Sequence, residues 1–344
     1  MDDSDSSVNP DTLTAFQPAD EMSGLIERVK VIGVGRTGIE AVKNLLADGR
    51  LGGLEFLCVD NDPKSLETID PSRTLLLEGP SVADEGTTED LAIWKAAALK
   101  ARKSIAEKFT DTYIAVVITD ARCAVSLGAS IVFASIAKEL NILSLAIGLS
   151  QMDSENSDSH TTASVEPGTL VSALIRAVVN AADSTFFFGN EEAHQLRTQK
   201  IGGDREYSPV FEATRDAVVC ITELLECSMI DLMDMRAVLA GKGVARMGTG
   251  LAEGQNRVLA AADQALNDPH LGASTLIQAR WFIAHIAGGP NLSFREIPTL
   301  AEYLYDQIDN DQADIVFGTA IEESLGDSLR VTIIAADLEN ITIH

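Results

Sequence analysis

From Arg28 onward, short runs of β-branched and apolar residues alternate with segments that have helical spacing. This alternation is typical of parallel strands connected and covered by helices, and it excludes an all-helical or an all-strand fold. The strands expected first along the chain are 29–34, 54–59, 114–119, 144–149 and 185–188. The expected helices are 37–48, 89–108 with a Thr88 cap, 168–182 and 210–225.

The second part of the chain continues the pattern, with expected strands 244–249, 280–286, 314–320 and 328–335 and helices near 254–267 and 295–308. A length of 344 residues favours two domains. The opening residues are rich in Asp, Ser and Pro and predict a disordered acidic tail. The expected divisions are a tail at 1–22, a first domain at 23–205, a long central helix at 206–228, a second domain at 229–338 and a short tail at 339–344.

The chain is strongly acidic, with 52 Asp and Glu against 26 Lys and Arg and a formal net charge of -26. Nucleic acid is therefore excluded as a partner, because phosphate binding needs a basic surface. The composition is still 46% hydrophobic, which indicates a folded protein with an acidic surface. Such a surface is expected in a salt-rich cytoplasm such as that of a halophilic archaeon, where repulsion is screened; an acidic protein from an ordinary cytoplasm is the alternative.

Cysteine, histidine and hydropathy patterns add three expectations. The four cysteines form no CxxC pair, which indicates reduced thiols in a cytoplasmic protein. The five histidines lack metal-ligand spacing, so no metal site is expected. No basic segment followed by an apolar run opens the chain, and no apolar run is long enough to span a bilayer, so direct membrane insertion is not expected.

A glycine turn follows the first expected strand and reads Gly33-Val-Gly35-Arg-Thr-Gly38, with Asp60 closing the next strand. This spacing fits a dinucleotide fingerprint, in which glycines allow a tight turn, a helix N-terminus meets the pyrophosphate and a carboxylate binds the ribose. An NAD-binding Rossmann enzyme is therefore one alternative. No Cys-His or Ser-Tyr-Lys catalytic set accompanies the turn.

The same segment also resembles the FtsZ family, through Val29-Lys-Val-Ile-Gly-Val-Gly35 and Leu54-Glu-Phe-Leu-Cys-Val-Asp-Asn-Asp62. The resemblance continues through Asp231-Leu-Met-Asp-Met-Arg-Ala-Val-Leu239, Met247-Gly-Thr-Gly250, Gly288-Gly-Pro-Asn-Leu292 and Ile315-Val-Phe-Gly318. It implies the tubulin/FtsZ fold, with a Rossmann-like nucleotide-binding-type domain, a long central helix and a smaller α/β C-terminal domain.

The family's GGGTGTG phosphate loop is replaced here by Arg122-Cys-Ala-Val-Ser-Leu-Gly128. A loop of that type points successive backbone amides at phosphate oxygens, which requires positive φ angles and no Cβ atoms. Only Gly128 remains, and it is expected at the start of a helix that runs to about Leu140. GTP is the ligand that the resemblance implies, and the lost loop predicts that it binds weakly or not at all.

The other nucleotide-facing positions that the resemblance implies are only partly kept. Phe211 matches the base-stacking aromatic, while Arg215 stands where guanine is usually recognised. Arg36 and Arg122 would both face the former phosphate site, where they either hold another anion or pair with Asp60, Asp62 or Asp120. The full set of implied nucleotide-site residues is Gly33, Gly35, Arg36, Gly38, Asp62, Arg122, Gly128, Glu155, Asn190, Phe211 and Arg215.

Asp231 and Asp234 match the two carboxylates of the FtsZ synergy loop, which the resemblance implies act in trans on the nucleotide of a neighbouring subunit. The favoured function is a divergent FtsZ-like cytoskeletal protein, deficient in GTP binding and hydrolysis, that associates with or modulates filaments in cell division or cell shape. Its expected partners are other FtsZ/tubulin-like subunits, of its own or another kind. The alternatives are a self-polymerising GTPase with an altered loop and the NAD-binding enzyme.

Overall fold

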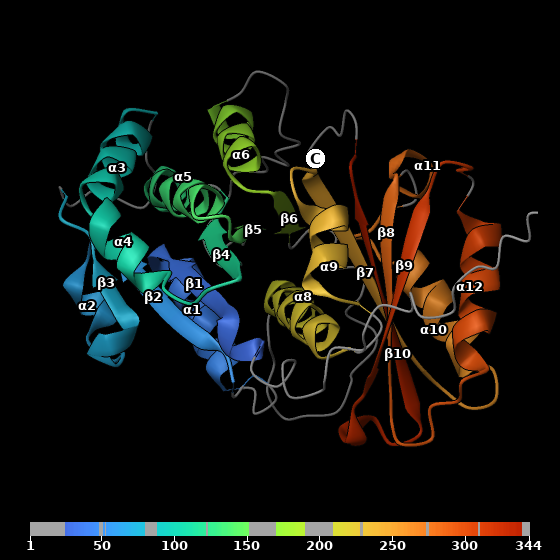
Figure 1. Ribbon diagram of the computed structural model, residues 1–344. Helices are drawn as coiled ribbons and strands as arrows, with labels where there is room; N and C mark the ends of the chain where they lie inside the picture. The colour runs from blue at the N-terminus through green and yellow to red at the C-terminus, as the bar shows by residue number, and fades with distance from the viewer. Residues whose placement is uncertain are drawn as a thin grey trace, which may run out of the picture.

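The computed structural model describes residues 25–47, 51, 53–79, 88–121, 123–150, 170–189, 209–227, 230–272, 275–308 and 310–338. Ten described strands form one sheet in the order β3-β2-β1-β4-β5-β6-β7-β10-β8-β9. Helices cover this sheet, so the α/β architecture predicted by the alternation is confirmed (Figure 1). The expected terminal tails lie outside the described residues.

The first six strands are parallel and form the N-terminal part of the sheet. Strands β1 and β4 are buried along nearly their whole length, as continuous apolar runs in a parallel sheet require. The strands are β1 (Val29–Val34), β2 (Glu55–Asp60), β3 (Thr74–Leu76), β4 (Ile114–Asp120), β5 (Leu143–Ser150) and β6 (Ser184–Gly189).

Helices lie on both faces of this part of the sheet (Figure 1). One face packs against α1 (Gly35–Leu46) and α8 (Pro209–Glu226). The other face is covered by α3 (Thr88–Lys100), α4 (Arg102–Lys108), α5 (Ala124–Glu139) and α6 (Leu170–Ala181). The short helix α2 (Pro63–Leu66) follows β2.

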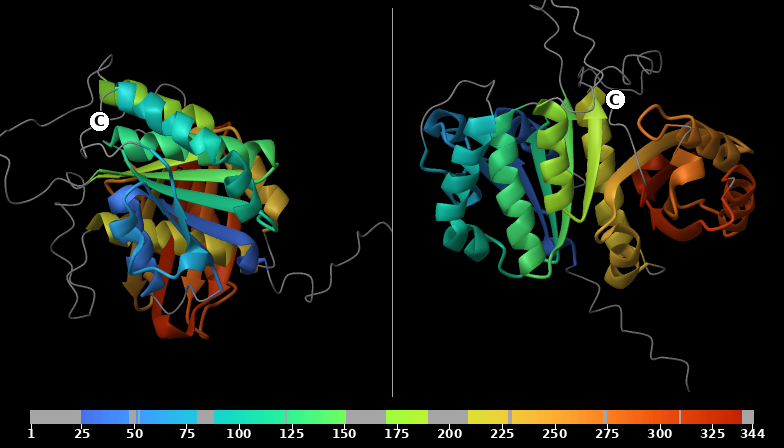
Figure 2. Two further views of the ribbon diagram at one scale, coloured as in Figure 1. Left: turned by 90° about the vertical axis from the view of Figure 1, so that its left-hand side faces the viewer. Right: turned by 90° about the horizontal axis from the view of Figure 1, so that it is seen from above.

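The C-terminal part of the sheet, coloured orange to red in Figure 2, contains both parallel and antiparallel pairs. Strand β10 is antiparallel to β7 and β8, and β8 is parallel to β9. Its strands are β7 (Gly243–Glu253), β8 (Trp281–Gly288), β9 (Asp314–Ile321) and β10 (Ser328–Ala336). Its helices are α9 (Leu232–Leu239), α10 (Arg257–Leu266), α11 (Thr275–Gln278) and α12 (Glu296–Gln307).

Strand β7 belongs to both parts of the sheet. Its first residues pair in parallel with β6, from Ser184 opposite Gly243 to Phe186 opposite Ala245. The rest of β7 pairs with β10. Gly248 and Gly250 on this strand face α10, where an added Cβ would collide with helix backbone atoms. The Met247-Gly-Thr-Gly250 sequence is therefore explained by close helix packing.

The sequence predicted one helix where the structure has two. The expected 89–108 helix ends at Lys100 and resumes at Arg102, because Ala101 has a turn conformation with ψ near 5°. This break lets Trp94 of α3 and Ile105 of α4 enter the same core. Strand β3 and helices α2 and α11 were not predicted, since each spans four residues or fewer. In the described ranges, no helix has the length and hydropathy needed to cross a membrane.

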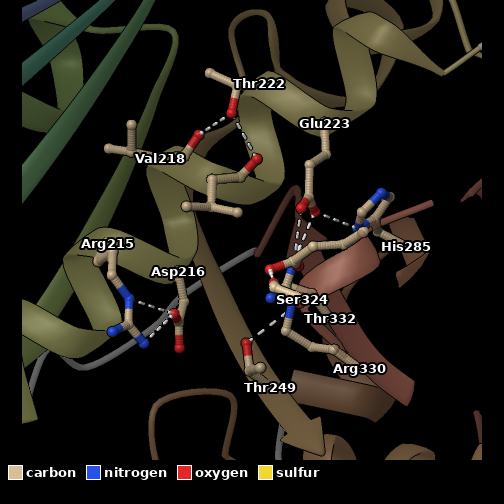
Figure 3. A network of polar contacts seen from close by, with 12 residues as sticks. Arg215, Asp216, Val218, Thr222, Glu223, Thr249, His285, Ser324, Arg330 and Thr332 are labelled. Atoms are coloured by element: carbon tan, nitrogen blue, oxygen red, sulfur yellow. Dashed lines mark hydrogen bonds and ion pairs between the residues drawn. The ribbon is translucent and has the colours of Figure 1, made fainter. Parts of the chain in front are cut away.

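Arg330 ties the central helix α8 to the C-terminal strands (Figure 3). Its guanidinium lies 2.7 Å from Glu223 Oε1 on α8 and 3.0 Å from Glu322 Oε2 after β9, and its side chain is 11% exposed. His285 lies beside Glu223, where burial, with a smaller contribution from Arg330, lowers the pKa of the imidazole to about 3. His285 is therefore neutral, and Arg330 supplies the positive charge between the two carboxylates.

Replacing Arg330 with Met should lower the free energy of unfolding by about 3–5 kcal/mol, because two buried carboxylates would lose their cation. Urea denaturation followed by circular dichroism measures this change. The control is Arg295→Met at an exposed site, where a change within about 0.5 kcal/mol is expected. Equal stability of the two variants would contradict the assigned role of Arg330.

Candidate functional site

The glycine turn after β1 lets α1 approach the sheet closely. A Cβ on Gly38 would lie 2.5 Å from the carbonyl oxygen of Ile118 on β4, and one on Gly33 would collide with Gly38. Gly35, the first residue of α1, has a φ of 71°, which only glycine adopts readily. The glycines thus place the N-terminus of α1 directly over the ends of β1 and β4.

The helix that follows β4 begins earlier in the chain than the sequence predicted. Helix α5 begins at Ala124 with Cys123 at its N-cap, so Ser126 already lies in the first turn. The Ser126 hydroxyl donates to the carbonyl oxygens of Asp120 and Cys123, at 3.3 and 3.2 Å. No glycine interrupts residues 124–127, so the helix can begin closer to β4.

The helix therefore starts four residues before Gly128, where its start was expected. Gly128 lies in the second turn of α5, where an added Cβ would be 2.6 Å from the carbonyl oxygen of Leu91 on α3 and 3.0 Å from the Cβ of Trp94. Its lack of a side chain serves the contact between two helices, which is among the most extensive in the fold. Close helix packing therefore accounts for the glycine at this position.

The glycine turn at the start of α1 and the start of α5 contact each other. A Cβ on Gly35 would lie 3.0 Å from the Cβ of Ser126. The Thr37 hydroxyl, in the first turn of α1, donates to Asp120 Oδ2 at the end of β4 over 3.0 Å. A carboxylate thus stands beside the positive end of a helix dipole, where a bound anion would otherwise be favoured.

The carboxylates after β2 are engaged in local turns. Asp60 Oδ1 accepts the backbone N–H groups of Asn61 and Asp62, at 2.7 and 3.2 Å. Asp62 Oδ1 accepts the N–H of Lys64 and caps α2. Asp60 does close the second strand, as the dinucleotide fingerprint requires, but one of its oxygens is already bonded to backbone.

On the central helix α8, the two residues that the resemblance implies contact the base, Phe211 and Arg215, both contact other residues of the protein. Phe211 is 8% exposed and belongs to the main hydrophobic core. Arg215 donates through Nε and Nη2 to Asp216 Oδ1, at 3.1 and 2.9 Å (Figure 3). The guanidinium is thereby held beside its own neighbour on the helix.

Asp231 and Asp234 lie together at the start of α9. Asp231 Oδ1 accepts the N–H groups of Met233 and Asp234, and Asp234 Oδ2 accepts the N–H of Asp231 at 3.0 Å. This capping box fixes both side chains while leaving both residues exposed. Met233 between them is 71% exposed, so this helix start combines two carboxylates with an apolar side chain at the surface.

The remaining implied residues divide into two groups. Arg36 is exposed at the second position of α1. Arg122, Glu155 and Asn190 lie outside the described residues, so the pairing expected for Arg122 stays a prediction. Among the described residues, no group of His, Cys, Asp and Glu is arranged to hold a metal ion.

Sequence reasoning did not assign Thr37 and Ser126 to the site and named Asp120 only as one of three possible partners for an arginine. The sequence feature that could have indicated this contact is Asp120, a carboxylate at the end of β4 just before the segment that replaces the glycine loop. Its partner Thr37 is 83 residues away in the chain. In the described residues, a hydroxyl–carboxylate contact and a helix start stand where the resemblance implies a glycine-rich phosphate loop.

Comparison with known proteins identifies the family of this architecture. The FtsZ family C-terminal domain matches residues 243–339. The cell division protein FtsZ of Azotobacter vinelandii is 31% identical over 318 residues, covering 90% of this chain and 77% of that protein. The chain also superposes on an empty FtsZ dimer structure from M. jannaschii, with a TM-score of 0.70, 18% identity and coverage of 93% and 92%.

A second similar structure is CetZ2 from Haloferax volcanii, solved as a GTPγS-bound protofilament. It has a TM-score of 0.69 and 17% identity, and it covers 91% of this chain and 94% of CetZ2. These structural matches confirm the predicted tubulin/FtsZ fold.

Replacing Gly128 with Ala should lower the free energy of unfolding by about 1–3 kcal/mol, because the methyl group would be forced against α3. Thermal or urea unfolding measures the change. Ser135→Ala on the same helix is the control; its hydroxyl bonds only to its own helix, to the carbonyl oxygen of Ile131, and a change within about 0.5 kcal/mol is expected. An unchanged free energy of unfolding in the Gly128 variant would contradict the claim that the contact with α3 requires a glycine here.

Proposed function

The chain belongs to the FtsZ family, and on that premise we propose that it is a divergent FtsZ-like cytoskeletal protein of cell division or cell shape that binds GTP weakly or not at all. It acts by associating with filaments built from other FtsZ-like subunits. The contact between Thr37 and Asp120, beside a helix that starts at Ala124, is the observation that carries this proposal.

Electrostatics disfavours a phosphate at this position. Two like charges about 4 Å apart near a protein surface repel by about 4 kcal/mol before screening by salt. A phosphate entering between α1 and α5 would meet the Asp120 carboxylate at close range. It would also find fewer backbone donors, because the N–H of Leu127 already donates to the carbonyl oxygen of Cys123 inside the helix.

The proposal also rests on the surface at the start of α9, where Asp231 and Asp234 are exposed. A subunit with these carboxylates, but without its own phosphate loop, is suited to only one half of a nucleotide-dependent joint. Relatives are known as a dimer and as a protofilament. We place this chain at the end or side of such assemblies as a modulator, in a salt-rich archaeal cytoplasm that its acidic surface suits.

Calorimetric titration with GTP and magnesium in multimolar KCl should give weak binding or none. A dissociation constant below about 1 μM, equivalent to about -8 kcal/mol, would refute the proposal. Asp120→Asn should strengthen residual binding at least about tenfold by removing the like charge. Asp111→Asn is the matched control, because Asp111 is exposed before β4, at the opposite end of that strand from Asp120, and no change is expected.

The same titration with NAD tests the enzyme alternative. Clear NAD binding that is lost in Asp60→Ala would favour a Rossmann enzyme over the proposed cytoskeletal function. The outcome expected here is no binding in either protein, because the first turn of α1 already contacts the start of α5.

Light scattering separates a modulator from a self-polymerising protein. The purified chain alone should show no GTP-dependent assembly, and substoichiometric amounts should change the assembly or turnover of an FtsZ-like partner from the same cell. The double variant Asp231→Asn, Asp234→Asn should lose that effect. Asparagine keeps the oxygen acceptors of the N-cap, so the loss would report charge and not folding.

A matched control for this double variant is Asp70→Asn, because Asp70 also accepts a backbone N–H, that of Ser72, at the start of a short 3-10 helix. It should keep the full effect on the partner. GTP-dependent filaments of the chain alone, or indifference of every FtsZ-like partner, would contradict the proposal.

A further inference from the structure

Strand β9 forms an open edge of the sheet. The opposite edge strand, β3, has three residues, whereas β9 has eight and, among the described strands, pairs only with β8. Its sequence, Asp314-Ile-Val-Phe-Gly-Thr-Ala-Ile321, contains no Pro, Lys or Arg. Natural proteins usually shorten an edge strand or place such residues on it to prevent further pairing, so β9 lacks the ordinary protection.

The backbone of β9 presents alternate amides outward. The backbone N–H of Asp314 donates to the carbonyl oxygen of Arg280, and that of Glu322 donates to the carbonyl oxygen of Gly288. The backbone N–H groups of the even-numbered residues therefore face β8. The backbone N–H and C=O groups of the odd-numbered residues therefore point away from β8. Thr319 donates to Cys227 Sγ at 3.2 Å, so the segment after α8 covers the edge there. Within the described ranges, the amides of Ile315 and Phe317 have no such partner.

An aromatic pair stands beside the open half of this edge. The rings of Phe317 on β9 and Tyr305 on α12 lie 6.5 Å apart, and Tyr305 is 58% exposed. Helix α12 lies beside the C-terminal strands (Figure 1). A strand added along β9 would place alternate side chains on this aromatic pair.

The segment that carries the edge has charges of one sign, although the exposed Arg280 lies at the start of β9, where its carbonyl oxygen accepts the Asp314 N–H. From Ile297 to Leu329 the sequence has eight Asp and Glu residues and no Lys, Arg or His. Asp306, Asp311 and Asp314 are exposed near the open half. A partner segment with Lys or Arg around a short β-branched core would match this surface in charge as well as in hydrogen bonding.

We propose that β9 binds an extended, basic, β-branched segment of another protein as an additional strand. The segment pairs with the outward amides and carbonyls of Ile315 and Phe317, contacts Tyr305, and places its basic residues beside Asp306, Asp311 and Asp314. A second copy of this chain is a poorer occupant, because pairing two copies of β9 would bring their acidic residues within contact distance, where salt screens repulsion least. The coverage at Thr319 limits the added strand to the first half of β9.

A labelled peptide, Lys-Val-Thr-Val-Thr-Val-Lys, tests this proposal by fluorescence anisotropy with the full chain. It should bind, and binding should weaken as KCl is raised from about 0.1 to about 1 M, where screening shortens from roughly 10 to 3 Å. The acidic analogue with Glu at both ends, and the basic peptide N-methylated at alternate residues, should not bind. Equal binding of either would overturn the proposal.

Variants locate the site. Tyr305→Ala should weaken peptide binding about three- to tenfold, the range expected for the loss of one aromatic contact. Asp306→Lys should weaken it as well, whereas Glu107→Lys makes the same charge change on α4, far from β9, and should leave it unchanged. Equal effects of the two lysine variants would show that only net charge matters and would overturn the assigned site.

Hydrogen exchange provides the structural readout. Peptide binding should protect the amides of Ile315 and Phe317 while leaving Thr319 as it is in the free protein. Protection elsewhere with none on β9 would refute strand addition. Protection of the same two amides by concentration-dependent dimerisation, without peptide, would assign the edge to a second copy instead.

Discussion

The close approach of α1 to β1 and β4 is the constraint on which the site depends. Gly33 and Gly38 permit it, since a side chain at either position would collide with backbone. Because parallel strands end at the same edge of a sheet, this approach also brings Thr37 to Asp120 and Gly35 to Ser126. The Asp120 carboxylate and the start of α5 thus lie at the edge of the sheet where the resemblance implies a phosphate loop.

The two parts of the sheet are joined independently of that site. Strand β7 pairs with β6 at one end and with β10 along the rest, so the backbone itself connects them. Arg330 adds a buried ionic link between α8 and the C-terminal strands. The relative placement of the two parts is therefore maintained by residues of the chain.

Much of the fold was predictable, because long apolar runs and helical spacing determine element type, and the predicted strands of both parts agree with the structure to within a few residues. The FtsZ-like motifs supplied the fold family. The site was less predictable. A lost glycine loop does not say what replaces it, so the extension of α5 to Ala124 and the packing role of Gly128 required coordinates. The partners Thr37 and Asp120 were hidden by their separation in the chain.

The most direct test of the central claim is a crystal structure of the protein grown with GTP and magnesium in excess at high salt. The account predicts that Thr37 Oγ1 stays hydrogen-bonded to Asp120 Oδ2, near 3.0 Å, with α5 still beginning at Ala124. Phosphate oxygens between the first turns of α1 and α5, with that hydrogen bond broken, would contradict it.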